Sequence, residues 1–271
     1  MDWGVIAMLT DWVFSRGRQA VLAQCVSAGV CVSAVAAPVA VRQREGSTHG
    51  FLVLRTLDGR TLAAGDDMRT AEGDRVTEHV VFRFRDGSVD DETTVYSQRG
   101  SFHMMSDHHV QRGPAFRKPY DVKVDVAAGT VTVRSSDGTK GKDEVFPMDL
   151  PDDLANGMLP LVMKNLRTGG GETRVTMVVA APKPRVVTMM IAAEGEDRFS
   201  AAGERHVATR FRVKTELGGV AGVVAPVIGK QPKDNRFWVV KGEGPEVLRI
   251  ETQMFEDGPV WRIDMPPLVW L

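Results

Sequence analysis

The sequence predicts a mainly all-β protein, built as one large curved antiparallel sheet or a half-open barrel with one or two short helices as a lid. Many short segments alternate apolar and polar residues, as strands with one wet face do. These segments recur at intervals of about ten residues, and turn sequences such as Asp58-Gly59 and Asp86-Gly87 separate several of them. One stretch, residues 152–167, has helical spacing instead.

The N-terminal segment has a composition of its own. Arg16 and Arg18 precede an apolar run over residues 20–37 that ends in Ala-Val-Ala-Ala. This order of charged, apolar and small residues predicts a secretory signal peptide over residues 1–36. Residues 37–271 then form a single β-rich domain, and we expect a periplasmic or secreted protein. An uncleaved membrane anchor is the alternative.

Composition narrows the partners and the chemistry. Cys25 and Cys31 both lie within the predicted signal peptide, so the mature domain would have no disulfide and would depend on its core. The formal net charge of −1 provides no strong field for a nucleic acid or an anionic membrane. We therefore expect no nucleic-acid partner and no thiol chemistry.

A first meander of strands follows the polar lead-in. From Val76 to Arg85 the pattern largely alternates, with Glu78 and Val81 as exceptions. Residues 65–73 are rich in turn formers and predict a loop. Strands are predicted over residues 51–57, 76–85, 88–98, 101–112, 122–126 and 131–133.

The helical stretch begins at Asp149–Asp153, where Pro151 favours a helix start. Apolar residues then recur at helical spacing up to a run of three glycines. This predicts a helix over residues 152–167 whose apolar stripe packs on the sheet, and Pro160 should kink or divide it. Strands resume over residues 174–181, 185–193, 206–214, 235–240, 247–255 and 260–265.

Residues 217–228 interrupt this pattern with an almost uncharged run of small and branched apolar residues. The run is too short for the ~20 apolar residues of a membrane span. Glycines at 218, 219 and 222 permit close approach and bends, and Pro226 interrupts regular structure. We expect a short broken helix or a folded-over lid that lies on the sheet.

Apolar residues on neighbouring predicted strands, together with this lid, provide a candidate ligand site. Methionine adapts to irregular shapes, so a cavity with methionines in its wall suits an acyl chain or a similar guest. An ordinary packed core is the alternative. The predicted ligand-binding residues are Met177, Met189, Ile191, Val220, Val224, Ile228, Phe237 and Trp238.

The histidines provide a candidate metal site. His103, His108 and His109 lie near Asp107, and imidazole and carboxylate are zinc ligands. On a straight strand, however, His103 and Asp107 would lie ~13 Å apart. A bulge, or a histidine from a neighbouring strand, would have to bring the ligands together, and solvated strand residues are the alternative.

Asp90, Asp91 and Glu92 are candidate paired acids. They follow the Asp86-Gly87 turn, where we expect a wet position and little reason for their pKa values to move.

Two resemblances add to these patterns. The segment GGVAGVVAPVIGKQP, followed by Phe237-Trp238-Val239-Val240 and GPVWRI, resembles the C-terminal signature of an uncharacterised family of exported bacterial proteins. The wider order, a signal followed by a curved meander with few helices, is similar to the LolA-like periplasmic lipoprotein-carrier fold. That resemblance implies a half-open barrel with a helical lid and an apolar interior, but a shared fold does not establish transport.

Taken together, these features predict an exported, cofactor-free binding protein for an apolar or lipid-like ligand, without catalysis. A structural or protein-binding module of the cell envelope with a solid core is one alternative, and it would have an envelope protein as its partner. A metal-dependent hydrolase that uses the histidine cluster is the other.

Overall fold

The structure is a computed structural model that describes residues 37–134, 142–167, 169–180, 183–201, 203–216, 232–265 and 269–270. These residues belong to one compact unit. The predicted signal peptide, 1–36, and the predicted lid, 217–228, lie outside the described residues.

Strands dominate the described residues, and one short helix, α1 (Leu159–Asn165), accompanies them. The first meander contains β1 (Thr48–Thr56), β2 (Thr61–Glu72), β3 (Arg75–Phe84), β4 (Val89–Ser97), β5 (His103–Arg112), β6 (Tyr120–Asp125), β7 (Thr130–Arg134) and β8 (Asp143–Pro147). After the helix come β9 (Thr173–Val179), β10 (Arg185–Ala201), β11 (Glu204–Glu216), β12 (Asn235–Val240), β13 (Glu246–Gln253), β14 (Val260–Asp264) and β15 (Val269–Trp270).

All these strands belong to one antiparallel sheet. Its order is β15-β10-β11-β12-β13-β14-β1-β2-β3-β4-β5-β6-β7-β8, and β9 pairs with β10 beside this path. The pairing of β14 with β1 joins the second meander to the first. The predicted fold class, a large curved antiparallel sheet, is therefore confirmed.

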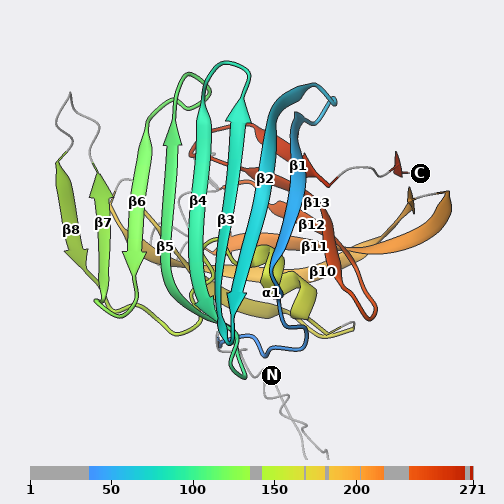
Figure 1. Cartoon of the computed structure of the whole chain (residues 1–271), viewed down its shortest axis with the longest axis horizontal. Coiled ribbons are helices and arrows are strands. Elements are labelled where there is room, and N and C mark those ends of the chain that lie inside the picture. The colour runs from blue at the N-terminus through green and yellow to red at the C-terminus, as the bar shows by residue number, and fades with distance from the viewer. Residues whose placement is uncertain are drawn as a thin grey trace, which may run out of the picture. The chain divides into compact units, whose positions relative to one another are not determined.

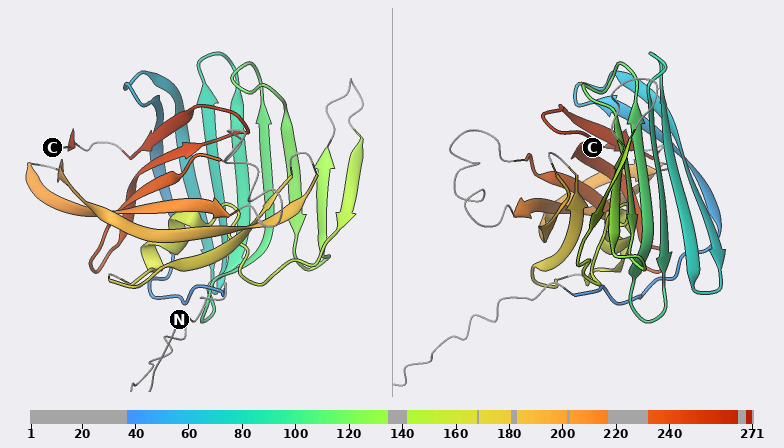
Figure 2. Two further views of the ribbon diagram at one scale, coloured as in Figure 1. Left: turned by 180° about the vertical axis from the view of Figure 1, so that it is seen from behind. Right: turned by 90° about the vertical axis from the view of Figure 1, so that its left-hand side faces the viewer.

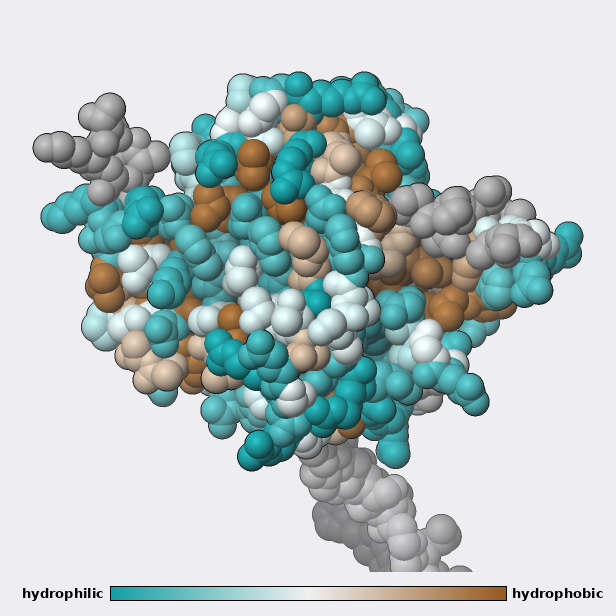
Figure 3. Space-filling model, viewed as in Figure 1, coloured by the Kyte–Doolittle hydropathy of each residue, from teal (hydrophilic) through white to brown (hydrophobic). Residues whose placement is uncertain are grey.

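The sheet curves so that its two halves face each other across the core. Strands β10–β13 cross behind the wall formed by β1–β8, and α1 lies between them (Figures 1 and 2). The main apolar cluster contains buried residues from both halves and from the helix, including Tyr96, Met104, Met163, Ile191 and Phe237. A second cluster, with Leu54, Phe82, Phe84, Phe116 and Trp261, occupies another part of the same inner face. The face of the molecule seen in Figure 3 is mostly hydrophilic, with apolar side chains scattered over it.

The helix is shorter than predicted and more buried than a lid would be. It begins only at Leu159, because Pro160 suits the first turn of a helix, where no backbone N–H is needed. The preceding residues instead pair with β9: the Asn156 side chain exchanges hydrogen bonds of 2.8 and 2.9 Å with the Val178 backbone. Most of α1 is buried in the main cluster. Within the described residues, no helix is long and apolar enough to cross a membrane.

Residues 65–73 were predicted as a loop, and this prediction is wrong, because most of them belong to β2. Gly65 occupies this strand because a Cβ there would lie 2.6 Å from the Phe82 ring of β3. A glycine inside a strand often marks such a close approach, not a turn.

Gly157 provides a test of how the segment before α1 seats on the sheet. It has φ +65°, and a Cβ there would overlap Thr94 Oγ1, whereas Gly73, with φ +62°, has open space around it. We expect Gly73→Ala to cost about 1 kcal/mol for the left-handed backbone. Gly157→Ala should cost about 2–4 kcal/mol, because overpacking is added. Chemical denaturation measures both free energies of unfolding, and equal losses would contradict this seating.

Candidate functional site

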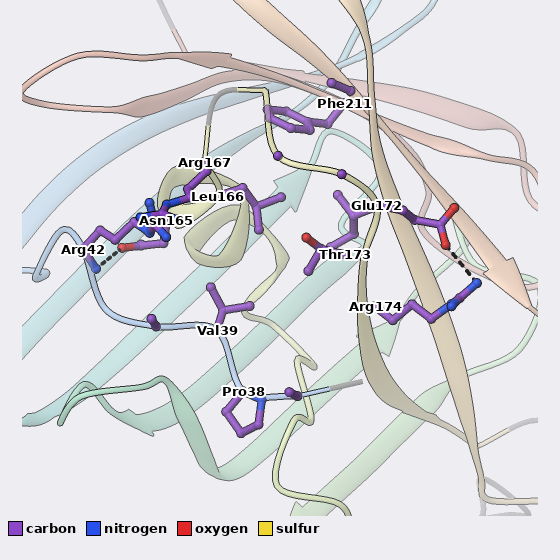
Figure 4. Close-up of a pocket in the computed structure, with 16 residues that line it drawn as sticks. Pro38, Val39, Arg42, Asn165, Leu166, Arg167, Glu172, Thr173, Arg174 and Phe211 are labelled. Carbon is purple, nitrogen blue, oxygen red and sulfur yellow. Dashed lines mark hydrogen bonds and ion pairs between the residues drawn. The ribbon is translucent and has the colours of Figure 1, made fainter. Parts of the chain in front are cut away.

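A groove of about 330 Å³ opens beside the C-terminal end of α1 (Figure 4). We call it the groove and define it by its lining, which combines residues 37–40 and 42, the segment that leaves α1, the start of β9, and three residues of β10 and β11. Its apolar lining includes Val39, Leu166, Ile191, Ala193 and Phe211. Segments far apart in the sequence therefore build one site.

Side-chain hydrogen bonds hold these segments in place. Asn165 Oδ1 accepts the backbone N–H groups of Arg42 and Gln43, each at 2.8 Å, while Asn165 Nδ2 donates to Leu161 O at 2.9 Å. Lys241 Nζ, just after β12, donates to Met163 O at 2.8 Å and to Leu166 O at 3.2 Å. The end of α1 is thus tied to the N-terminal segment on one side and to the second meander on the other.

A second pocket of about 300 Å³ shares Arg42, Leu166 and Arg167 with the groove. We call it the cationic pocket, because Lys164 and Lys241 also line it. Burial and, to a smaller extent, the positive charge of the nearby Arg42 together lower the pKa of Lys241 to about 8. Arg42 and Arg167 lie together on one side of the groove, whereas the Glu172–Arg174 ion pair, at 2.8 Å, lies across from them (Figure 4).

Beneath the helix, the inner face of the sheet carries a buried charge network. Lys164 Nζ lies 2.8 Å from Glu45 Oε1, and Arg69 bridges Glu45 at 3.0 Å, Asp67 at 2.6 Å and Glu78 at 2.9 Å. All five side chains are at most 10% exposed. Burial raises the pKa of Glu78 to about 7 against the attraction of Arg69, and it also raises the pKa of Asp67.

The polar residues continue along β4 and β5. His109 Nε2 lies 3.3 Å from Asp90 Oδ2, and Nδ1 lies 4.0 Å from Glu92 Oε1. Burial lowers the pKa of His109, but Glu92 and Asp90 outweigh it and raise the value to about 10. Burial and then Glu92 raise the pKa of Asp107 to about 7, although Thr94 donates a hydrogen bond of 2.8 Å to that carboxylate.

The acids at residues 90–92 were expected to be wet, and for Asp90, which is 4% exposed, this expectation is wrong. The Glu92 side chain is 26% exposed, but burial raises its pKa, which was not expected. The inner face carries acids at Asp67, Glu78, Asp90 and Asp107 that sequence reasoning did not single out as a network. One signal was present: Glu78 stands on the apolar side of the Val76–Arg85 alternation.

The three predicted metal-ligand histidines do not converge. His108 pairs with Asp121 at 2.9 Å, whereas His109, the next residue on the strand, pairs with Asp90. A bulge does occur in β5, between the partners of Val95 and Tyr96, but His103 lies opposite Ser97 at the start of the strand. Within the described parts of the chain, no group of three or more His, Cys, Asp or Glu residues is arranged to hold a metal.

The predicted ligand-binding residues that the structure describes belong to two different apolar clusters. Met189, Ile191 and Phe237 are buried in the main cluster, and Met177 packs against it. Trp238 belongs to a separate cluster with Phe199 and Ala208. Of these five residues, Ile191 lines the groove. The other three, Val220, Val224 and Ile228, lie outside the described residues.

Stability should fall as pH rises from 5 to 8.5. Between the unfolded pKa of a glutamate, about 4.3, and the folded value of about 7, native Glu78 holds a proton that the unfolded chain has released. The contribution of Glu78 to the free energy of unfolding is therefore fully present below the unfolded pKa of about 4.3, and it is lost as pH rises through the folded pKa of about 7. Asp107 and His109 act in the same direction.

Glu78→Gln mimics the protonated side chain, so we expect it to flatten this pH dependence and to raise the melting temperature at pH 8 by a few degrees. Thermal melts across the pH range measure the slope. The exposed Glu256→Gln is the matched control. An unchanged slope in Glu78→Gln would show that this carboxyl does not titrate as described.

No protein-family model and no curated protein sequence matches the chain. Among solved structures, it is similar to a protein from Brucella abortus, described as a beta-barrel-like protein of domain of unknown function DUF1849. The two share 11% sequence identity, the match covers 84% of this chain and 99% of that chain, and the TM-score is 0.46. A likeness of this size carries no argument about function. The resemblances to an exported family and to the LolA-like fold remain predictions.

Proposed function

We propose that the protein is an exported binding protein for a lipid-like ligand whose apolar part lies in the groove. The observation that carries the proposal is the apolar lining of the groove, formed by Val39, Leu166, Ile191, Ala193 and Phe211. A methylene group that leaves water gains about 0.8 kcal/mol, so an acyl chain must have several methylene groups covered to offset the cost of association. Binding needs no cofactor and no catalytic group.

Among the described residues, the groove shares Ile191 with the site expected from the sequence. Met189 and Phe237 do not line it, whereas Phe211, from the same buried cluster, does. We therefore place the ligand at the end of the helix. A surface groove also allows a ligand to enter and leave without opening of the sheet.

A second candidate function is a structural or protein-binding module of the cell envelope. The observation that favours it is the packed interior, in which Tyr96, Met158 and Met163 are almost completely inaccessible to solvent. Such a module would leave the groove without a lipid-like ligand, so a direct binding measurement separates the two candidates.

Export is part of the proposal and rests on the pattern of residues 1–36. We expect the full chain, expressed in a Gram-negative bacterium, to be recovered from the periplasm or the medium with Ala37 as its first residue. Fractionation and N-terminal sequencing measure this. A chain that keeps its N-terminus and stays in the cytoplasm would contradict export but not ligand binding.

Ala193→Trp tests the groove itself. Ala193 is exposed at the lining of the groove, so an indole there should fill the space without disturbing the core. We expect dodecanol to bind the wild-type chain and to bind this variant at least ten-fold more weakly, as measured by calorimetry or by displacement of a fluorescent probe.

The exposed Ala127→Trp, in the turn after β6, is the matched control and should bind like the wild type. Failure of the wild-type chain to bind dodecanol or any other single-chain amphiphile would favour the structural module.

A further inference from the structure

We propose that the cationic pocket takes the anionic head group, a carboxylate or a phosphate, of the amphiphile whose chain lies in the groove. This inference rests on the proposed function and adds the chemical class of the ligand. In the proposed arrangement, the acyl chain of the amphiphile lies along Ile191 and Phe211, and its head group lies among Arg42, Arg167 and Lys241.

The two sites are continuous. Arg42, Leu166 and Arg167 line both of them. Lys241, which lines the cationic pocket, also stands over the Phe211 ring, with Nζ 5.0 Å from the ring centroid. Phe211 belongs to the groove. An amphiphile whose chain lies against Phe211 therefore has its head group beside Lys241. One molecule can occupy both the groove and the cationic pocket.

Three of the four cations that line the cationic pocket, Arg42, Arg167 and Lys241, have no carboxylate partner within the described residues. The side chains of Arg42 and Arg167 form no hydrogen bond and no ion pair in the part of the chain that the structure describes, whereas the backbones do: Arg42 N–H donates to Asn165 Oδ1, and Arg167 O accepts from Gly170 N–H. Lys241 donates to two helix carbonyls, so one of the three protons of its ammonium group remains for a ligand oxygen. Lys164 differs, because its ammonium group pairs with Glu45 at 2.8 Å on the inner side of the helix and with Glu246 at 3.6 Å.

This arrangement fits an anion and disfavours a cation or a neutral head. Two guanidinium groups and an ammonium group present several N–H donors to one pocket. Hydrogen bonds between charged partners are stronger than those between neutral groups. Arg42 and Lys241 line the same pocket, and their like charges repel each other, which adds to the effect of burial on the pKa of Lys241. An anionic head would relieve this repulsion, whereas a neutral alcohol would not.

The test compares head groups on one chain length with the full protein at moderate salt. We expect dodecanoate and dodecyl phosphate each to bind at least ten-fold more tightly than dodecanol, and this advantage should shrink as salt concentration rises. The relative affinities of the two anions identify which head group the pocket prefers.

Arg42→Gln/Arg167→Gln should remove most of the advantage of the anions, measured in the variant as the ratio of its affinity for each anion to its own affinity for dodecanol. Arg112→Gln/Arg117→Gln removes the same charge from exposed positions elsewhere and should leave the advantage intact. Arg42→Lys/Arg167→Lys, which keeps the charge, should retain much of it.

The outcomes separate the two levels of the proposal. Equal affinity for dodecanol and both anions, or an advantage that the two double glutamine variants reduce equally, overturns the head-group site and leaves the groove in place. If none of the three amphiphiles binds, the proposed function itself fails.

Discussion

The pairing of Lys164 with Glu45 is the interaction on which the site depends. It joins the helix to the N-terminal segment, and Arg69 carries the connection on to β2 and β3. Removal of one partner from such a buried pair leaves a charge without compensation, which typically costs 3–5 kcal/mol. The next residue, Asn165, accepts hydrogen bonds from the backbone of Arg42 and Gln43. The Lys164–Glu45 pair and these hydrogen bonds therefore hold the helix against the same N-terminal segment, which forms one wall of the groove.

The curved sheet explains why charges are buried at all. Its register places Arg69 beside Glu78, Glu78 beside Thr94 and Thr94 beside Asp107, so one polar row crosses four strands of the inner face. The two main apolar clusters take different parts of that face. A slip of any of these strands by one residue would turn its member of the polar row outward and leave the adjacent members without partners. The row therefore also specifies the register of the strands.

The fold was largely predictable from the sequence, whereas the site was not. Alternation and turn residues locate most strands, because burial of one face is a local property of each segment. Two residues that depart from the alternating pattern have a structural reason: Glu78, on an apolar face, belongs to the buried charge network, and Gly65 lies where β2 and β3 approach closely. Adjacent strand residues face opposite sides, and Phe237 and Trp238 accordingly belong to different apolar clusters. The groove combines segments more than a hundred residues apart, which no local pattern reveals.

The short helix separates two electrostatic environments. On its inner side, Lys164 pairs with Glu45, and burial raises the pKa values of Glu78 and Asp67 in the same network. On its outer side, Lys241 caps the last carbonyls of the helix and so offsets the negative end of its dipole. Arg42 and Arg167 then add positive charge at the same end. A chain with a net charge of −1 thus presents a locally positive pocket, because Arg42, Arg167 and Lys241 meet at the end of the helix.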